Sequence, residues 1–474
     1  MPICDAAWNA PASAVAGSAE IMCSARREES HWSHPHHRGH RRRSFLAGLA
    51  GSAASACSVV TLGGCGRADA PAIRFWAMGR EGEVATTLLQ GFLQENPGVQ
   101  VRVEQLPWSA AHEKLLTAFA GDATPDVAQM GNTWLPEMAA LGALEPLDGW
   151  LARTPSIDRS DHFEGIWATN RIEDRTVGLP WYVDTRLLFV RKDLLASVGF
   201  QDVPTHWDDW VRCLAALKAG PVATPLLLPT NEFEPLLALA LQQDEELLRD
   251  GGRYGNFSAA GFRRALGFYR SLFERGYAPG LTNNQVANVW QEFGRGTFAF
   301  YISGPWNIGE FKRRLPASLQ SAWTTAPLPG PHGPGASIAG GSSLVLFKRS
   351  AHKAQAWRLI EYLSRPEVQR TFYRLTGNLP PRRSAWQLPL GDAPPLAQDP
   401  LARAFALQLE RVRATPAVPE WERIVQDMQL AAARSVHERQ PLEDTTRRLD
   451  AHVDALLEKR RWMLSRAPKS SNPS

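Results

Sequence analysis

The chain has 474 residues, of which 44% are hydrophobic and 21% charged, so it is too long for one ordinary domain and apolar enough for real cores. Its net charge is only +4, and outside residues 1–64 there are 46 basic residues against 44 acidic ones. This balance argues against a nucleic-acid partner and against electrostatic attachment to an anionic membrane. The length suits two lobes.

The N-terminal region carries the pattern of an export signal. The sequence RRRSFL, which includes Arg42 and Arg43, is followed by a stretch without charged residues that runs to Gly64. This core resembles a twin-arginine signal, and a generic basic region is an equal alternative. The sequence LGGC that ends at Cys65 resembles the lipobox of bacterial lipoproteins, in which the cysteine is acylated. We therefore expect residues 1–64 to be an export signal with an N-terminal prefix, and the mature chain to be lipid-anchored in the periplasm or at the outer face of the cell membrane.

The first part of the mature chain predicts alternating strands and helices. Residues 72–76 and 99–103 are expected to form strands, each followed by a helix with apolar residues at helical spacing. This alternation predicts a parallel sheet covered by helices, in which ligands bind at loops beyond the carboxyl ends of the strands. The loops expected there are residues 77–82, with Arg80 and Glu81, and residues 131–134, with Asn132 and Trp134.

A stretch near the middle of the chain predicts a hinge between two lobes. Residues 178–194 read GLPWYVDTRLLFVRKDL: a turn-like Gly-Leu-Pro, two aromatic residues, a lone acid and a short apolar run. The run at residues 187–190 is expected to be a buried strand. We expect ligand to lie where Trp181, Tyr182 and Asp184 emerge, although the two aromatic residues suit interlobe packing equally well.

The second half predicts a further strand, two linkers and a helical C-terminal region. Residues 298–302 are expected to form a buried strand that leads to a loop with Trp306 at its tip. Residues 327–335 contain four prolines and three glycines, which predicts a linker that crosses between lobes. Residues 414–419 predict another linker, and residues 421–462 are expected to be helical and docked on the body.

Several motifs occur in a characteristic order between residues 70 and 465. They are FLQENPGVQV at 92–101, TPDV at 124–127, LGALEPLD at 141–148, GLPWY at 178–182, GPW at 304–306 and TGNLP at 376–380. Together they resemble the extracellular solute-binding proteins of sugar-specific ABC importers, the group typified by maltose-binding protein. The resemblance implies an α/β chain with the two-lobed periplasmic-binding-protein fold, three interlobe crossings and closure on ligand by hinge motion.

The resemblance also implies domain boundaries. The crossings are expected near Asp184, in residues 327–335 and in residues 413–418. The first lobe would comprise residues 65–184 and 331–412, the second lobe residues 185–330 and 413–466, and residues 467–474 a disordered tail.

The resemblance implies roles for individual side chains as well. Asp184 matches a carboxylate that hydrogen-bonds sugar hydroxyls, and Trp134, Trp306 and Trp421 match aromatic residues that stack on sugar faces. The full set of expected ligand contacts is Arg80, Glu81, Asn132, Trp134, Trp181, Tyr182, Asp184, Trp306, Gly341, Ser342 and Trp421.

The predicted function is the capture of an oligosaccharide, an α-linked glucoside such as maltose or trehalose, for delivery to ABC permease subunits in the membrane. We expect a monomer that needs no cofactor or metal. We also expect that the chain is not an enzyme, because the sequence has no HExxH, GxxxxGK[ST] or GxSxG motif. Two alternatives stay open at this point. One is a secreted glycoside hydrolase with Asp184 and Glu81 as its carboxylate pair. The other is the same fold binding a non-sugar solute such as a polyamine.

Overall fold

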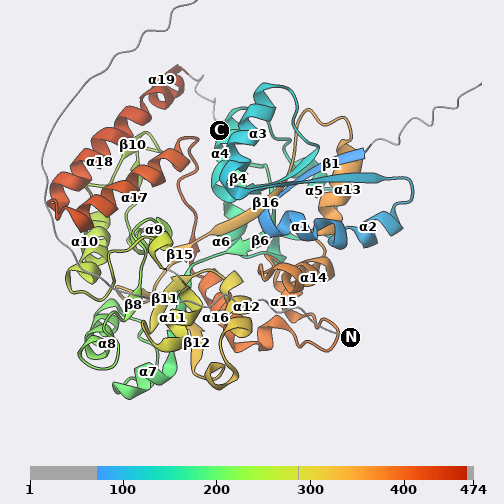
Figure 1. The fold of residues 1–474 in the computed structure, drawn as a ribbon. Coiled ribbons are helices and arrows are strands. Elements are labelled where there is room, and N and C mark those ends of the chain that lie inside the picture. The colour runs from blue at the N-terminus through green and yellow to red at the C-terminus, as the bar shows by residue number, and fades with distance from the viewer. Residues whose placement is uncertain (1–71, 287, 467–474) are drawn as a thin grey trace, which may run out of the picture. The chain divides into compact units, whose positions relative to one another are not determined.

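The computed structural model describes residues 72–286 and 288–466 (Figure 1). The predicted export signal with Arg42 and Arg43, the predicted lipidation site Cys65 and the predicted tail 467–474 lie outside the described residues. Among the described residues, no helix combines the length and hydrophobicity needed to cross a membrane.

Four strands from the first part of the described chain and one later strand, β16, form a five-stranded sheet in the order β2-β1-β3-β16-β6 (Figure 1). Parallel pairing joins β1 to β2 and to β3, whereas β16 runs antiparallel to β3 and β6. The strands are β1 (Ala72–Met78), β2 (Gln100–Leu106), β3 (Val127–Gly131), β6 (Leu179–Asp184) and β16 (Gly340–Leu346).

Alternation along β1 explains why both faces of this sheet are covered. Ile73 and Phe75 belong to one apolar cluster and Trp76 and Met78 to another, as the two-residue period of a strand requires. We call this sheet and the helices whose apolar residues complete the two clusters the first lobe. These helices are α1 (Gly79–Leu88), α2 (Gln90–Glu95), α13 (Lys353–Leu363) and α14 (Pro366–Thr376) on one face, and α3 (Trp108–Ala120) and α4 (Leu135–Ala140) on the other.

A four-stranded sheet in the order β12-β7-β11-β8 forms the second layered unit. Leu188 and Val190 of β7 enter one cluster, and Leu187 and Phe189 enter the opposite one, which confirms the buried strand predicted there. We call this sheet and its covering helices the second lobe. Its strands are β7 (Leu187–Arg191), β8 (Leu226–Leu227), β11 (Phe300–Ser303) and β12 (Trp323–Ala326).

Helices contribute apolar side chains to both clusters of the second lobe. One cluster draws on α7 (Lys192–Ser197), α8 (Trp207–Ala219), α9 (Glu234–Leu241), α10 (Ala260–Glu274), α17 (Trp421–His437) and α18 (Leu442–Leu456). The other draws on α6 (Glu164–Ala168), α11 (Val289–Arg295), α12 (Trp306–Arg314), α15 (Arg383–Gln387) and α16 (Pro400–Leu409). The C-terminal helices α17 and α18, red in Figure 1, pack against each other and against α10. This confirms that the C-terminal region is helical and docked.

The remaining elements are short. They are α5 (Asp148–Leu151), α19 (Glu458–Arg466), the 3₁₀ turns η1 (Asn132–Trp134), η2 (Arg159–Asp161), η3 (Asn283–Gln285), η4 (Ala317–Leu319) and η5 (Leu396–Gln398), and the strands β4 (Arg171–Ile172), β5 (Arg175–Thr176), β9 (Leu248–Arg249), β10 (Tyr254–Gly255), β13 (Pro329–Gly330), β14 (Gly333–Pro334), β15 (Ser337–Ile338) and β17 (Val412–Arg413).

Three passages of chain between the two sheets lie side by side. The first leads from β6 to β7, the second from β15 into β16, and the third leads from α14 of the first lobe towards α16 of the second, with the bridge between Val183 and Leu379 beside the first. Strand β17 pairs with β15 in parallel but lies between α16 and α17 of the second lobe, so the crossing predicted at residues 413–418 is wrong. Gly340 pairs with Asp184, and the Ser337 hydroxyl donates to the Arg186 carbonyl at 2.8 Å while accepting from its N–H at 3.2 Å. These bonds tie the three passages together at the junction of the lobes.

The structure corrects two predicted boundaries. Residues 327–335 do not cross between the lobes, because they fold into the β13–β14 hairpin, and the crossing follows in β15 and β16. The predicted first lobe includes residues 400–409, but helix α16 packs on β12 and contributes Phe405 and Leu409 to a cluster of the second lobe, so it belongs to the second lobe.

Two predicted turns are regular structure instead. Leu179 and Pro180 open strand β6, and Pro180 is tolerated because β6 is an edge strand and its register with β16 shifts between Ser342 and Ser343. Residues 77–82 are not a loop: β1 continues to Met78, and Gly79, at φ +47°, turns the chain directly into α1.

Candidate ligand-binding cleft

A cavity of about 630 Å³ lies where the chain passes between the lobes. The carboxyl ends of the parallel strands β1 and β3 lie together at one edge of the sheet, and the residues that follow them line this cavity. We call this cavity the cleft. Its walls include Arg80, Glu81, Trp108, Asn132, Trp134 and Tyr182 of the first lobe, Asp184, Thr185, Arg186, Ile338, Gly340 and Gly341 of the passages, Phe233, Glu234, Trp306 and Glu422 of the second lobe, and Thr376 and Asn378 after α14.

Glu81 places a buried carboxylate in the first turn of α1. The Asn378 side-chain amide donates to its Oε1 at 2.6 Å. Burial raises the pKa of the Glu81 carboxyl above its ordinary value, although hydrogen bonds from Asn378, Tyr182 and Trp108 oppose the shift. The group is therefore a firmly positioned acceptor that faces the cleft.

The buried side-chain amide of Gln129 holds part of the cleft wall in place. Gln129 of β3 accepts from the Met78 N–H at 2.8 Å and donates to the hydroxyls of Tyr182 and Ser342, each at 3.3 Å. These bonds link β1, β3, β6 and β16 through a single side chain. Tyr182 is thus held at the cleft wall, whereas Ser342 is fully buried in the supporting network.

Asn132 presents an unused hydrogen-bond donor. Its Oδ1 accepts from the Ser343 hydroxyl at 2.9 Å, which fixes the orientation of the amide. Its Nδ2 is buried and has no partner among the described residues. An unpaired buried donor costs about 1–3 kcal/mol, so a ligand oxygen that accepts from it would recover that cost.

Three indole rings, those of Trp108, Trp134 and Trp306, lie in the aromatic part of the wall. Trp134 is 9% exposed, and its ring centroid lies 5.7 Å from that of Trp108 and 5.1 Å from that of His112. Trp306, the first residue of α12, is 37% exposed. A Cβ on Gly304 would lie 2.0 Å from the Trp306 ring, so the Gly-Pro-Trp sequence lets the ring lie directly over the backbone.

An ion network lies at the first passage. The Arg186 guanidinium contacts Asp184 Oδ1 and Glu234 Oε1, both at 2.5 Å, and lies over the Trp306 ring at 4.9 Å. Burial raises the pKa of Asp184, and Arg186 opposes that shift. Burial lowers the pKa of Arg186, but the two carboxylates outweigh it and raise the value above its ordinary range. Arg186 therefore stays charged and joins the passage to both α9 and α12.

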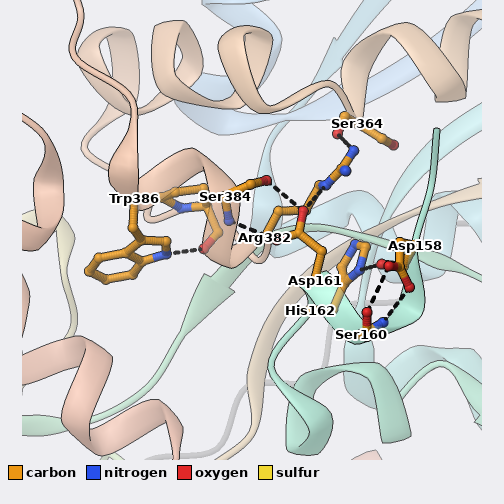
Figure 2. Close-up of polar contacts among 9 residues, drawn as sticks. Asp158, Ser160, Asp161, His162, Ser364, Arg382, Ser384 and Trp386 are labelled. Carbon is orange, nitrogen blue, oxygen red and sulfur yellow. Dashed lines mark hydrogen bonds and ion pairs between the residues drawn. The ribbon is translucent and has the colours of Figure 1, made fainter.

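A second polar cluster fixes the segment that carries Asn378 (Figure 2). Asp161 accepts from Arg382 Nε and from the Ser384 N–H, each at 2.7 Å. The neighbouring His162 ring bonds the Asp158 carbonyl at 2.8 Å, and burial lowers the pKa of His162 to about 4, so it is neutral at neutral pH. The Val183 N–H donates to the Leu379 carbonyl at 2.9 Å. These contacts attach the segment after α14 to β6 and η2.

The structure brings eight of the predicted contact residues to the cleft. They are Arg80, Glu81, Asn132, Trp134, Tyr182, Asp184, Trp306 and Gly341.

Three other predicted residues are not at the cleft wall. Trp181 is fully buried and stacks on Phe372 at 4.4 Å, so it packs within the first lobe. Ser342 lies in the Gln129 network described above. Trp421 is fully buried in the core of the second lobe, and its neighbour Glu422 reaches the cleft instead, because successive helical residues point about 100° apart.

Sequence reasoning missed several residues of the wall. Arg186 follows Asp184 by two residues in extended chain, and this spacing places both side chains on one side of the passage. Asn378 lies inside the TGNLP motif, which contributes to the family resemblance but predicts no ligand contact. Trp108 falls at a predicted loop, which is a local signal for ligand contact, although it is not among the expected contacts. Glu234 and Phe233 carry no local signal, because their positions depend on how distant elements pack.

Two layered α/β lobes joined by three adjacent passages, with a polar and aromatic cleft at the junction, define a binding protein of the hinged two-lobed class. The chain belongs to the bacterial extracellular solute-binding protein family, whose sequence model matches residues 79–370. This confirms the predicted family and the predicted two-lobed fold.

Individual relatives agree with this assignment. The structure of the sugar-binding protein MalE from Xanthomonas citri is 53% identical, with a TM-score of 0.81 over 84% of this chain and 100% of its own. The GacH receptor of Streptomyces glaucescens is 24% identical, with a TM-score of 0.69 over 82% and 98% of the two chains, and so shares the fold. The diacetylchitobiose binding protein DasA of Streptomyces coelicolor is 23% identical over 336 residues, which span 69% of this chain and 75% of its own.

Proposed function

We propose that this chain binds an oligosaccharide in the cleft, an α-glucoside such as maltose or trehalose, and delivers it to the permease of an ABC importer. The observation that carries the proposal is the combination of the exposed Trp306 ring with fixed polar groups in one cavity. The 53% identity to a structure described as a sugar-binding protein supports the same ligand class.

The chemistry of the wall matches the chemistry of a sugar. A pyranose has apolar C–H faces, which flat indole rings bury, and hydroxyl edges, which carboxylates and guanidinium groups bind through charge-assisted hydrogen bonds. Trp134 and Trp306 supply the rings. Glu81 supplies an acceptor, and the unpartnered Asn132 amide supplies a donor.

The pairing of Asp184 with Arg186 favours binding over hydrolysis, although burial raises the pKa of Glu81 in the direction that a general acid needs. A glycosidase of the usual kind needs one protonated acid beside the leaving oxygen and a second carboxylate opposite it. Asp184 is paired with Arg186 at 2.5 Å, and Glu81 accepts from Asn378 at 2.6 Å. Both groups are engaged as acceptors, which suits a site that orients hydroxyls.

A thermal-shift screen with product analysis tests the proposal. Maltose, trehalose and longer α-glucosides should raise the unfolding temperature in a saturable way, because a ligand that binds only the folded state stabilises it. No monosaccharide should be released on long incubation. Turnover would favour a hydrolase, and stabilisation by polyamines with none by any sugar would favour a non-sugar solute.

We also propose that Cys65 carries a lipid anchor. The protein would act as a monomer whose two lobes close over the ligand. The support for the anchor is the LGGC sequence after an uncharged stretch. Replacing Cys65 with serine should release the protein from the membrane fraction, and unchanged fractionation would contradict the anchor.

A further inference from the structure

A larger cavity of about 1210 Å³ opens beside the cleft. Arg80, Trp306 and Thr376 line both cavities, so these three residues form the boundary between them. We call the larger cavity the side chamber. The charged residues of its remaining wall are Glu310, Lys312, Arg313, Arg370, Arg374 and Asp399.

The side chamber has an excess of positive charge. Arg80 and four further basic residues line it, against two acidic residues. Both acids are already paired: Asp399 contacts Lys312 at 2.8 Å, and Glu310 contacts Arg313 and, at 2.6 Å, Arg314. Neither acid forms an ion pair with Arg370 or Arg374, although the charge of Asp399 acts on Arg370 at longer range.

Arg370 is the most informative of these residues. It is 3% exposed, and its Nε and Nη2 donate to the Leu388 and Pro394 carbonyls, each at 2.9 Å. No described carboxylate forms an ion pair with it; burial lowers its pKa, and the charge of Asp399, which is itself paired with Lys312, only partly opposes that shift. A buried cation without a directly paired anion is costly, and the planar guanidinium has five donors, of which these two bonds use two.

Arg374 lies one helical turn further along α14 and is exposed. Residues four apart share one face of a helix, so both guanidinium groups belong to the chamber side of α14. Neither forms an ion pair with a described residue. The two arginines and the ring of Trp306 thus form a continuous wall from the cleft into the chamber.

We propose that the side chamber receives an anionic substituent, a phosphate, sulfate or carboxylate, carried by the sugar bound in the cleft. The inference rests on the proposed function. A substituent can reach the side chamber only if its sugar ring lies in the cleft against Trp306, because Trp306 and Arg80 form the boundary between the two cavities. Guanidinium groups bind such planar or tetrahedral anions through paired hydrogen bonds. The ligand class is then an acidic oligosaccharide, for which a neutral α-glucoside is a weaker analogue.

Calorimetric titration of the full chain with matched probes tests this inference. The probes are maltose, maltobionate and maltose 6′-phosphate, which place no charge, a carboxylate at one end or a phosphate at the other. At low salt, at least one charged probe should bind about fivefold tighter than maltose. The advantage should shrink in 0.5 M NaCl because salt screens exposed charges.

Matched variants locate the effect. Arg374→Gln should reduce the ratio of charged to neutral affinity. Arg358→Gln should preserve the ratio, because Arg358 is an exposed arginine of α13 that lines neither cavity. Inorganic phosphate alone should not change the affinity for maltose.

Each other outcome overturns the inference in a distinct way. Equal affinities for maltose and both charged probes would leave the proposed function intact but contradict the proposal that the side chamber receives an anionic substituent. A rise in maltose affinity with inorganic phosphate would assign the chamber to a free anion instead. Absence of binding by all three probes would remove the proposed function and the inference together.

Discussion

Replacing Trp306 with alanine is expected to weaken oligosaccharide binding by about 1–3 kcal/mol, a roughly 5- to 150-fold rise in Kd. The ring is 37% exposed and lines the cleft, so its removal takes away a stacking surface without emptying the core. It also lies over Arg186, and that contact would be lost as well. Calorimetric titration with the best sugar of the thermal screen measures the effect.

The matched control for this variant is Trp462→Ala. Trp462 is 54% exposed on α19 and lines neither the cleft nor the side chamber, so its loss should leave Kd unchanged. Trp134→Ala should weaken binding by a similar amount to Trp306→Ala, with an added loss of stability because Trp134 packs on Trp108 and His112. Unchanged affinity in both cleft variants would refute the aromatic wall as the binding surface.

Replacing Arg186 with methionine is expected to lower the free energy of unfolding by about 3 kcal/mol. The guanidinium is only 11% exposed and pairs with two carboxylates at 2.5 Å, so its loss leaves Asp184 and Glu234 facing each other without a cation. Urea denaturation measures the change. The triple variant Asp184→Asn, Arg186→Met and Glu234→Gln should recover part of the stability, because it removes the unpaired charges.

A surface ion pair provides the comparison. Arg295→Met breaks the pair with Glu292 on α11, whose arginine is mostly exposed, and such pairs contribute about 0–1 kcal/mol. If Arg186→Met changed stability no more than Arg295→Met, the Asp184–Arg186–Glu234 network would not stabilise the junction of the lobes.

Much of this architecture could be predicted because it follows from the spacing of apolar residues within single strands and helices. The alternation in β1 and β7 requires both faces to be buried, and the structure covers each face with an apolar cluster. Asp184 could be predicted because it is a lone acid after a run of buried residues. Trp306 could be predicted because Gly-Pro-Trp follows a buried strand and so exposes the ring at its end.

What could not be predicted depends on contacts between distant segments. Helix α16 has an ordinary amphipathic pattern, and nothing in that pattern states which of two sheets it covers. Trp421 and Glu422 differ by one helical position, so the choice between them depends on the rotation of α17, which the packed core sets. The hydrogen-bond partners of Arg370 are also set by distant packing: its guanidinium donates to two backbone carbonyls and to no carboxylate.

The most direct test of the central claim is a crystal structure of the protein with a bound α-glucoside. We expect one sugar ring to stack on Trp306, with a hydroxyl accepting from Asn132 Nδ2 and another donating to Glu81. A sugar bound outside the cleft, or an empty cleft at saturating sugar, would contradict the account.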